Sequence, residues 1–255
     1  MTTWVLLRGL MREKRHWGEF SAQFKKAMGE QQIVMLDFPG NGGLYSQTSM
    51  NSVEGMANYC RDQLRVLGCK PPYRVLALSL GAMVAVEWSK RHPGEIERMV
   101  LINTSLGQHN PFYHRLRPAN YPALVRFLVF GSKLQREQLI LRLTSTKERT
   151  HDEQAELQEQ WTNYALESPI TRTNILRQLY AALRYRAAPI APSVPVLLLV
   201  GLGDRLVDAK CSLTLAEQWG CEIKLHQAAG HDLPLDDGSW VTEQISQWVV
   251  ETGGI

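Results

Sequence analysis

Short apolar runs alternate with amphipathic stretches along the first hundred residues. The apolar runs span residues 4–7, 32–37, 74–78 and 99–103. Their Val, Ile and Leu content is typical of strands buried on both faces of a parallel sheet. The amphipathic stretches span residues 13–29, 53–67 and 80–91, with apolar side chains three and four positions apart. This spacing indicates helices with one buried face, and the alternation predicts a doubly wound parallel sheet.

The alternation stops at about residue 109 and resumes at about residue 190. Between these points the sequence holds only helical patterns, at 120–130, 132–145, 152–167 and 171–186. Two further strands are predicted at 194–201 and 221–227, followed by helices at 208–219 and 237–250. We therefore expect a six-stranded, mainly parallel sheet formed by residues 1–108 and 190–255. Residues 109–189 are expected to form a helical cap inserted after the fourth strand.

A serine stands where the third apolar run meets the helix that follows it. Ser79 has small residues two positions before it, at Ala77, and two positions after it, at Gly81. A buried strand, a sharp turn and a helix around a serine are typical of a nucleophile elbow. The small neighbours fit, because such a turn brings adjacent chain too close for larger side chains. Taken alone, the pattern also fits an ordinary loop serine.

An acid and a base follow the last two predicted strands. Asp204 follows the fifth strand and His231 the sixth. The carboxyl ends of parallel strands meet at one edge of a sheet, so we expect both side chains to approach Ser79. Neutral imidazole can take the serine proton, and a carboxylate fixes its tautomer. Asp208 is an alternative acid, although it can instead cap the next helix. Three other acids are interpreted as charges in the first turn of a helix: Asp232, Asp236 and Asp237.

These residues resemble the α/β-hydrolase family, and within it the capped group of small carboxylesterases and the pimeloyl-ester esterase of biotin synthesis. The resemblance covers nearly the whole chain. It rests on Asp37-Phe38-Pro39-Gly40-Asn41-Gly42, Ala77-Leu78-Ser79-Leu80-Gly81, His92-Pro93, Gly201-x-x-Asp204-x-x-Val207, Gly230-His231, and Trp17 nine positions after Arg8. It implies that Ser79 is the nucleophile, Asp204 the acid and His231 the base. The backbone N–H groups of Leu80 and Leu10 are then the expected oxyanion donors.

Three features depart from the family pattern. Arg8 stands where the family usually has histidine, which puts the shape and charge of the oxyanion loop in doubt. Ala77 replaces the first glycine of the elbow. The chain also begins at what is normally the third strand, so we expect a sheet without the usual first hairpin.

The charge of the chain is small but unevenly placed. The net charge is +3, which indicates no nucleic-acid partner. Residues 109–190, however, hold 12 Arg and Lys against 7 Asp and Glu. The excess is either a solvated helical face or a means of attracting an anionic substrate tail, through His114, Arg115, Arg117 or Arg126. The candidate pocket residues are Arg8, Met11, Tyr113, His114, Arg115 and Phe127.

The sequence predicts a cytoplasmic serine hydrolase that acts on a small-molecule ester, as a monomer or homodimer. Its 255 residues, 44% of them hydrophobic, suit a globular enzyme, and no apolar run is long enough to insert into a membrane. Its four cysteines show no metal-ligand spacing, so neither a metal nor another cofactor is expected. The expected reaction is cleavage of a carboxylic ester, or a thioester, of a small to medium acyl group. A C–C bond hydrolase or lyase with the same triad is one alternative. A low-turnover ligand-binding or sensor protein is another, supported by Arg8 and Ala77.

Overall fold

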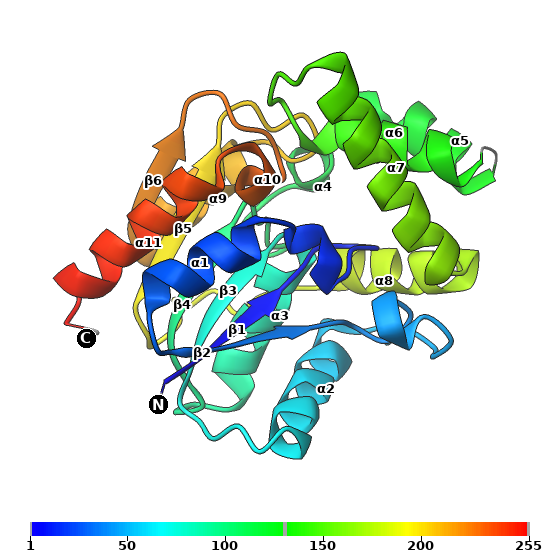
Figure 1. Ribbon diagram of the computed structural model, residues 1–255. Helices are drawn as coiled ribbons and strands as arrows, with labels where there is room; N and C mark the ends of the chain where they lie inside the picture. The colour runs from blue at the N-terminus through cyan, green and yellow to red at the C-terminus, as the bar shows by residue number, and fades with distance from the viewer. Residues whose placement is uncertain (1, 130–131, 254–255) are drawn as a thin grey trace.

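The computed structural model describes residues 2–129 and 132–253, with side chains described up to residue 126 and again from residue 132 (Figure 1). Within these residues, six strands form one sheet: β1 (Thr3–Leu7), β2 (Gln32–Leu36), β3 (Tyr73–Leu78), β4 (Ile96–Ile102), β5 (Val196–Gly201) and β6 (Glu222–His226). Their spatial order is β2-β1-β3-β4-β5-β6, and every neighbouring pair is parallel. The predicted doubly wound sheet is confirmed. The order reverses between β1 and β3, and such a switch point is where open α/β sheets bind ligands.

Burial along the strands explains why the apolar runs were so uniform. Every residue of β1, β3 and β5 is buried, since each of these strands has neighbours on both sides and helices on both faces. The edge strands β2 and β6 are mostly half-buried and carry polar residues, as edge strands generally do.

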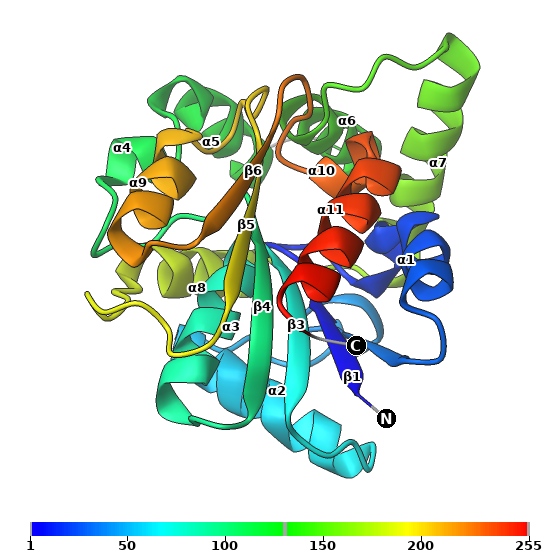
Figure 2. The same cartoon turned by 90° about the vertical axis from the view of Figure 1, so that its left-hand side faces the viewer.

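Helices cover both faces of the sheet (Figures 1 and 2). One face is covered by α1 (Phe20–Met28) and α11 (Gly238–Glu251), whose Phe24 and Trp248 pack in a core with Trp4 of β1. The other face is covered by α2 (Val53–Val66), α3 (Leu80–Arg91) and α9 (Lys210–Trp219). The two cores leave the carboxyl ends of the strands free to carry a site.

Five α-helices lie between β4 and β5 in the described part of the chain: α4 (Phe112–Arg115), α5 (Tyr121–Val129), α6 (Lys133–Thr144), α7 (His151–Glu167) and α8 (Arg172–Arg184). The 3-10 turn η3 (Pro118–Asn120) joins the first two. Figure 2 shows α4 to α7 gathered at one end of the sheet. We refer to the elements from α4 to α8 as the helical insertion. The division of this insertion from the core as a separate cap domain stays a prediction. No helix in the described ranges is long and apolar enough to span a bilayer.

One predicted helix is divided in the structure, and two short elements were not predicted. The stretch at 13–29 forms a 3-10 turn, η1 (Lys14–Trp17), and then α1, because Gly18 adopts a positive φ of +51°. The backbone N–H of Lys14 donates to Asp37 Oδ1 at 2.6 Å, which holds the turn against the loop after β2. A short helix α10 (Leu233–Asp236) precedes α11, and a further 3-10 turn, η2 (Gly42–Leu44), follows β2.

Candidate active site

Ser79 occupies a strained turn between β3 and α3. Its φ of 55° and ψ of −112° are unfavourable for a residue with a Cβ atom, and the Ser79 N–H donates to the Ile102 carbonyl at 3.0 Å. A Cβ atom at Gly81 would lie 2.6 Å from the Leu7 carbonyl oxygen, so glycine is required at that position. Ala77 is fully buried in β3, where a methyl group is accommodated. The surrounding sheet therefore holds the serine in an elbow geometry.

His231 and Asp204 form a direct pair beside this turn. The distance from His231 Nδ1 to Asp204 Oδ2 is 2.6 Å, and each residue is only 4% exposed. The other Asp204 oxygen accepts the N–H groups of Leu206 at 2.7 Å and Val207 at 2.9 Å, which fixes the carboxylate. A proton on Nδ1 donated to Asp204 leaves Nε2 able to accept one. The alternative acid, Asp208, instead accepts the Lys210 N–H at 3.0 Å at the start of α9.

The charged form of His231 is stabilised by its carboxylate partner. Burial lowers the pKa of His231, but the Asp204 carboxylate, together with a smaller contribution from Asp232, raises it by more. The net pKa therefore lies above the ordinary histidine value. An imidazole placed this way can hold a proton taken from a nearby hydroxyl.

Asn103 connects the three strand ends around this pair, and the sequence analysis assigned it no role. Its Nδ2 donates to the carbonyl oxygens of Gly230 and His231, both at 2.9 Å, and its Oδ1 accepts the Gly201 N–H at 2.9 Å. Its φ of 45° is also unusual for a residue other than glycine. The available signal was that the fourth apolar run ends on a polar residue, because that position lies at the same edge of the sheet.

Ser79 and His231 line one cavity of about 140 Å³. Its remaining walls are largely apolar, and the insertion contributes Leu116, Leu124, Ile140, Leu143, Ile175 and Leu179. Leu10 and Met11, from the loop after β1, line another part of the wall. An apolar chamber with a few convergent polar groups is the usual form of a small-molecule site.

The loop after β1 approaches the serine closely. A Cβ atom at Gly9 would lie 3.3 Å from Ser79 Cβ. The Met11 N–H donates to Gln178 Oε1 of α8 at 3.0 Å, and this bond fixes the loop. Within the described ranges, neither the Leu10 nor the Leu80 N–H donates a hydrogen bond to another residue. Both N–H groups are therefore unoccupied by the described residues.

Comparison with known proteins identifies the family. Residues 4–244 match the model of the alpha/beta hydrolase family. The chain belongs to this family. The match includes all six strands except Thr3 of β1, together with the positions of Ser79, Asp204 and His231, and it confirms the family that the sequence motifs predicted.

Solved structures of two esterases share the fold of this hydrolase. A thermophilic esterase from Thermogutta terrifontis superposes with a TM-score of 0.77 at 18% identity, covering 98% of this chain and 90% of that one. An esterase from Exiguobacterium antarcticum gives a TM-score of 0.77 at 15% identity, covering 98% and 92%. In sequence, 102 residues are 28% identical to the biotin biosynthesis bifunctional protein BioHC of Teredinibacter turnerae, which is 40% of this chain and 17% of that protein.

Arg8 pairs with the residue that follows His231 in the hydrolase. Its guanidinium bonds both carboxylate oxygens of Asp232, at 3.0 and 2.5 Å, and Arg8 is 2% exposed. Its Cζ also lies 4.8 Å from the centre of the Trp17 ring. The Asp232 N–H donates to the Thr144 carbonyl at 2.7 Å, which links the histidine loop to the insertion. The interpretation of Asp232 as a simple helix charge was wrong, because the side chain is a buried ion-pair partner.

The other two acids near α10 and α11 have different roles. Asp236 is not a simple helix charge either, because it accepts the Gly230 N–H at 2.7 Å and the Thr146 N–H at 3.0 Å. It therefore holds the chain before His231 against the segment after α6. Asp237 accepts the Trp240 N–H at 3.0 Å and caps α11, in keeping with its interpretation.

Only some of the predicted pocket residues reach the cavity. Arg8 and Met11 line it. Tyr113 and His114 are not among its lining residues, and Tyr113 is 48% exposed. Arg115 is also absent from it, because its buried guanidinium donates to the Ala182 carbonyl at 2.6 Å near the end of α8. The side chain of Phe127 lies outside the described residues.

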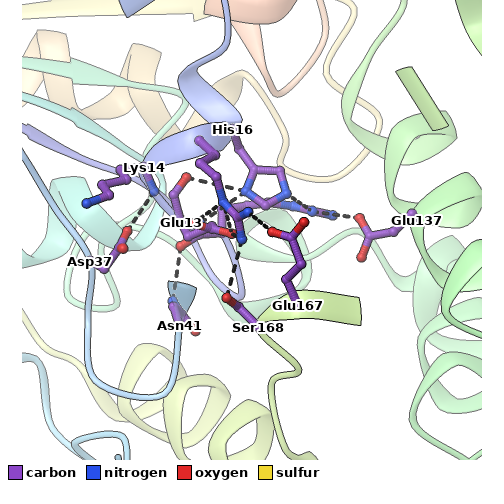
Figure 3. Close-up of polar contacts among 10 residues, drawn as sticks. Glu13, Lys14, His16, Asp37, Asn41, Glu137, Glu167 and Ser168 are labelled. Carbon is purple, nitrogen blue, oxygen red and sulfur yellow. Dashed lines mark hydrogen bonds and ion pairs between the residues drawn. The ribbon is translucent and has the colours of Figure 1, made fainter. Parts of the chain in front are cut away.

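The segment after β1 also contacts the helical insertion (Figure 3). Arg12 Nη1 lies 2.7 Å from Glu137 Oε2 of α6 and 2.8 Å from His16 Nε2. Burial and the Arg12 guanidinium hold the pKa of His16 well below its usual range, so a neutral ring accepts the Arg12 hydrogen bond. Arg15 bonds Glu167 at the end of α7. These pairs fix the insertion over the site and neutralise Arg12, whose side chain lines the cavity.

The described residues offer no evident metal site. Among residues 2–129 and 132–253, no three His, Cys, Asp or Glu side chains are grouped to hold a metal ion. The four cysteines are unpaired, and burial raises the pKa of Cys211 to about 12 and that of Cys221 to about 11.

Proposed function

We propose that this hydrolase cleaves a carboxylic ester or thioester of a small to medium acyl group through an acyl-enzyme. One observation carries the proposal: the strained Ser79 shares an apolar cavity with His231, which Asp204 holds at 2.6 Å. A hydroxyl, an oriented imidazole and free backbone N–H donors are the groups that acyl transfer needs. The esterases that share the fold support an ester as the substrate.

The reaction follows from these groups in two halves. Ser79 Oγ bonds to the acyl carbon while its proton passes to His231 Nε2, and the oxyanion is held by the Leu10 and Leu80 N–H groups. The tetrahedral intermediate then expels the alcohol or thiol, which takes the proton from His231. Water repeats the sequence: His231 accepts its proton, its oxygen attacks the acyl carbon, and Ser79 leaves with the proton restored.

The cavity sets the size and charge of the acyl group. A dry cavity of about 150 Å³ admits benzene, so this one of about 140 Å³ suits an apolar group of roughly six carbons. The two arginines that line it, Arg8 and Arg12, are paired with Asp232 and Glu137. No unpaired cation among the described lining residues is available for an acyl carboxylate. A neutral chain is therefore favoured over the anionic tail considered from the sequence.

A series of p-nitrophenyl esters tests this function. We expect kcat/KM to rise by about fourfold per methylene from acetate to hexanoate, because each buried methylene contributes about 0.8 kcal/mol. It should fall for decanoate and longer chains, which exceed the cavity. A fluorophosphonate probe should label Ser79 in the same preparation. A ligand-binding protein without turnover would not be labelled. A profile that peaks at dodecanoate, or the absence of labelling, would contradict the proposal.

The pH dependence of kcat/KM tests the base. Neutral His231 is the active form, and its pKa is raised by Asp204 against the effect of burial. Activity should therefore be full above the raised pKa and fall as the pH drops through it, with an inflection above the ordinary value of about 6.5. The measurement is kcat/KM for p-nitrophenyl butyrate between about pH 5 and 9. An inflection below the ordinary histidine value would exclude His231 as the base in this environment.

A further inference from the structure

A large basic groove lies on the helical insertion, apart from the catalytic cavity. Its volume is about 840 Å³, and it is bounded by α5, α6, the start of α7 and the loop after β5. Six of the described residues that line it are cationic: Arg126, Arg136, Arg142, Lys147, Arg149 and Arg205. No described lining residue is an Asp or Glu. Much of the basic excess that the sequence placed between residues 109 and 190 is therefore concentrated in one concavity.

Among the described residues, part of the positive charge of this groove has no paired carboxylate. In the described part of the chain, Arg126, Arg142 and Arg205 have no carboxylate within 4.0 Å. Arg149 has Asp236, but at 3.8 Å, and its guanidinium also donates to Ser145 Oγ at 2.8 Å. Gathering like charges in one concavity is unfavourable unless an anion offsets them.

Amide side chains add neutral donors to the same groove. They come from Gln135 and Gln138 of α6 and from Gln154 and Gln158 of α7. Gln138 Nε2 donates to Gln158 Oε1 at 3.1 Å, which joins the two helices across the groove. Guanidinium and amide groups together match the oxygen atoms of phosphate groups, which accept several hydrogen bonds at once.

The groove and the catalytic cavity lie on opposite sides of α6. Ile140 and Leu143 line the cavity, whereas Leu139 and Arg142 line the groove. The two sites come together at the loop after β5, where Arg205 of the groove directly follows Asp204. A ligand held in the groove would therefore lie beside the catalytic acid.

We propose that this basic groove binds the phosphate groups of an organic polyphosphate. Several cations around one concavity match a ligand with several negative charges, whereas a single carboxylate would leave most of them unpaired. The concave shape suits a compact ligand rather than a flat protein surface. The phosphate belongs either to the leaving group of the substrate or to a separate ligand. The first source rests on the proposed hydrolase function; binding itself does not.

Calorimetry with inorganic pyrophosphate tests the site directly. We expect Arg142→Glu and Arg126→Glu each to weaken pyrophosphate binding by about tenfold or more, since each removes a charge-assisted contact and adds repulsion. Arg184→Glu is the matched control, because Arg184 is an exposed arginine of α8 outside the groove. Unchanged thermal unfolding would show that the variants remain folded. No binding to the native protein, equal weakening in the control, or binding of polyglutamate but not pyrophosphate would overturn the proposal.

Two thioesters distinguish the sources of the phosphate. Butyryl-coenzyme A carries phosphate groups on its leaving thiol, and S-butyryl-N-acetylcysteamine is its phosphate-free counterpart. If the phosphate belongs to the substrate, Arg142→Glu lowers kcat/KM for the first thioester only, by about tenfold. If the phosphate belongs to a separate ligand, Arg142→Glu changes kcat/KM equally for both thioesters, although the variant still loses pyrophosphate binding. Failure to hydrolyse either thioester would count against the proposed function and leave the binding measurement valid.

Discussion

Replacing Ser79 with alanine will reduce ester hydrolysis by on the order of 10⁴–10⁶-fold, because no other hydroxyl at this turn can form the acyl-enzyme. The measurement is kcat for p-nitrophenyl butyrate in the native protein and in Ser79→Ala, with intact mass recorded after fluorophosphonate treatment. The variant should take up no probe. Hydrolysis within about tenfold of the native rate would refute the assignment of Ser79 as the nucleophile.

Ser79→Gly provides the matched control for folding. The φ of 55° and ψ of −112° at this position strain any residue with a Cβ atom, and glycine adopts them freely. Both variants should be inactive, but Ser79→Gly should be more stable to denaturant than Ser79→Ala by about 1–3 kcal/mol. This difference would show that the surrounding fold maintains the strained geometry. Equal stability of the two variants would mean that the turn relaxes in solution.

The sequence predicted the sheet well because its signals are local. Apolar runs such as those of β3 and β5 are buried along their whole length, and Ser79 and Asp204 stand in the segments that follow them. Chain order and parallel pairing are then enough to bring Asp204 and His231 together. The break at Gly18 was missed, because apolar spacing across residues 13–29 is compatible with one helix. Only the positive φ at Gly18 divides it.

Ion pairs between residues that are far apart in the sequence leave no local pattern of this kind. Arg8 and Asp232 are 224 positions apart, and Arg12 and Glu137 are 125 apart. Arg12, Glu137 and Asp232 each look like an ordinary surface charge in their own segments, and Arg8 stood out only as a departure from the family pattern. The contacts of Arg115 could not be predicted for the same reason, because its acceptor carbonyls lie in another helix of the insertion. The basic excess of the insertion was visible in the sequence, but its concentration in a groove depends on how α5, α6 and α7 pack.

Arg8→Met will lower the free energy of unfolding by about 3–5 kcal/mol, since it leaves the Asp232 carboxylate buried without its partner. Urea denaturation measures the change. Arg65→Met is the control, because Arg65 and Asp62 are 61% and 66% exposed and their pair contributes about 1 kcal/mol or less. In the double variant Arg8→Met/Asp232→Leu most of the lost stability should return, since apolar residues can replace a buried ion pair.

The same pair should position and tune His231, which immediately precedes Asp232. Beyond burial and Asp204, the Asp232 carboxylate raises the pKa of His231 and the Arg8 guanidinium lowers it. The inflection of kcat/KM with pH should therefore move up in Arg8→Met and down in Asp232→Asn. A residue that only stabilised the fold would not move the two inflections in opposite directions. Unshifted inflections in two folded variants would restrict the pair to a structural role. Opposite shifts would show that arginine, where the family usually has histidine, balances the charge beside the catalytic base.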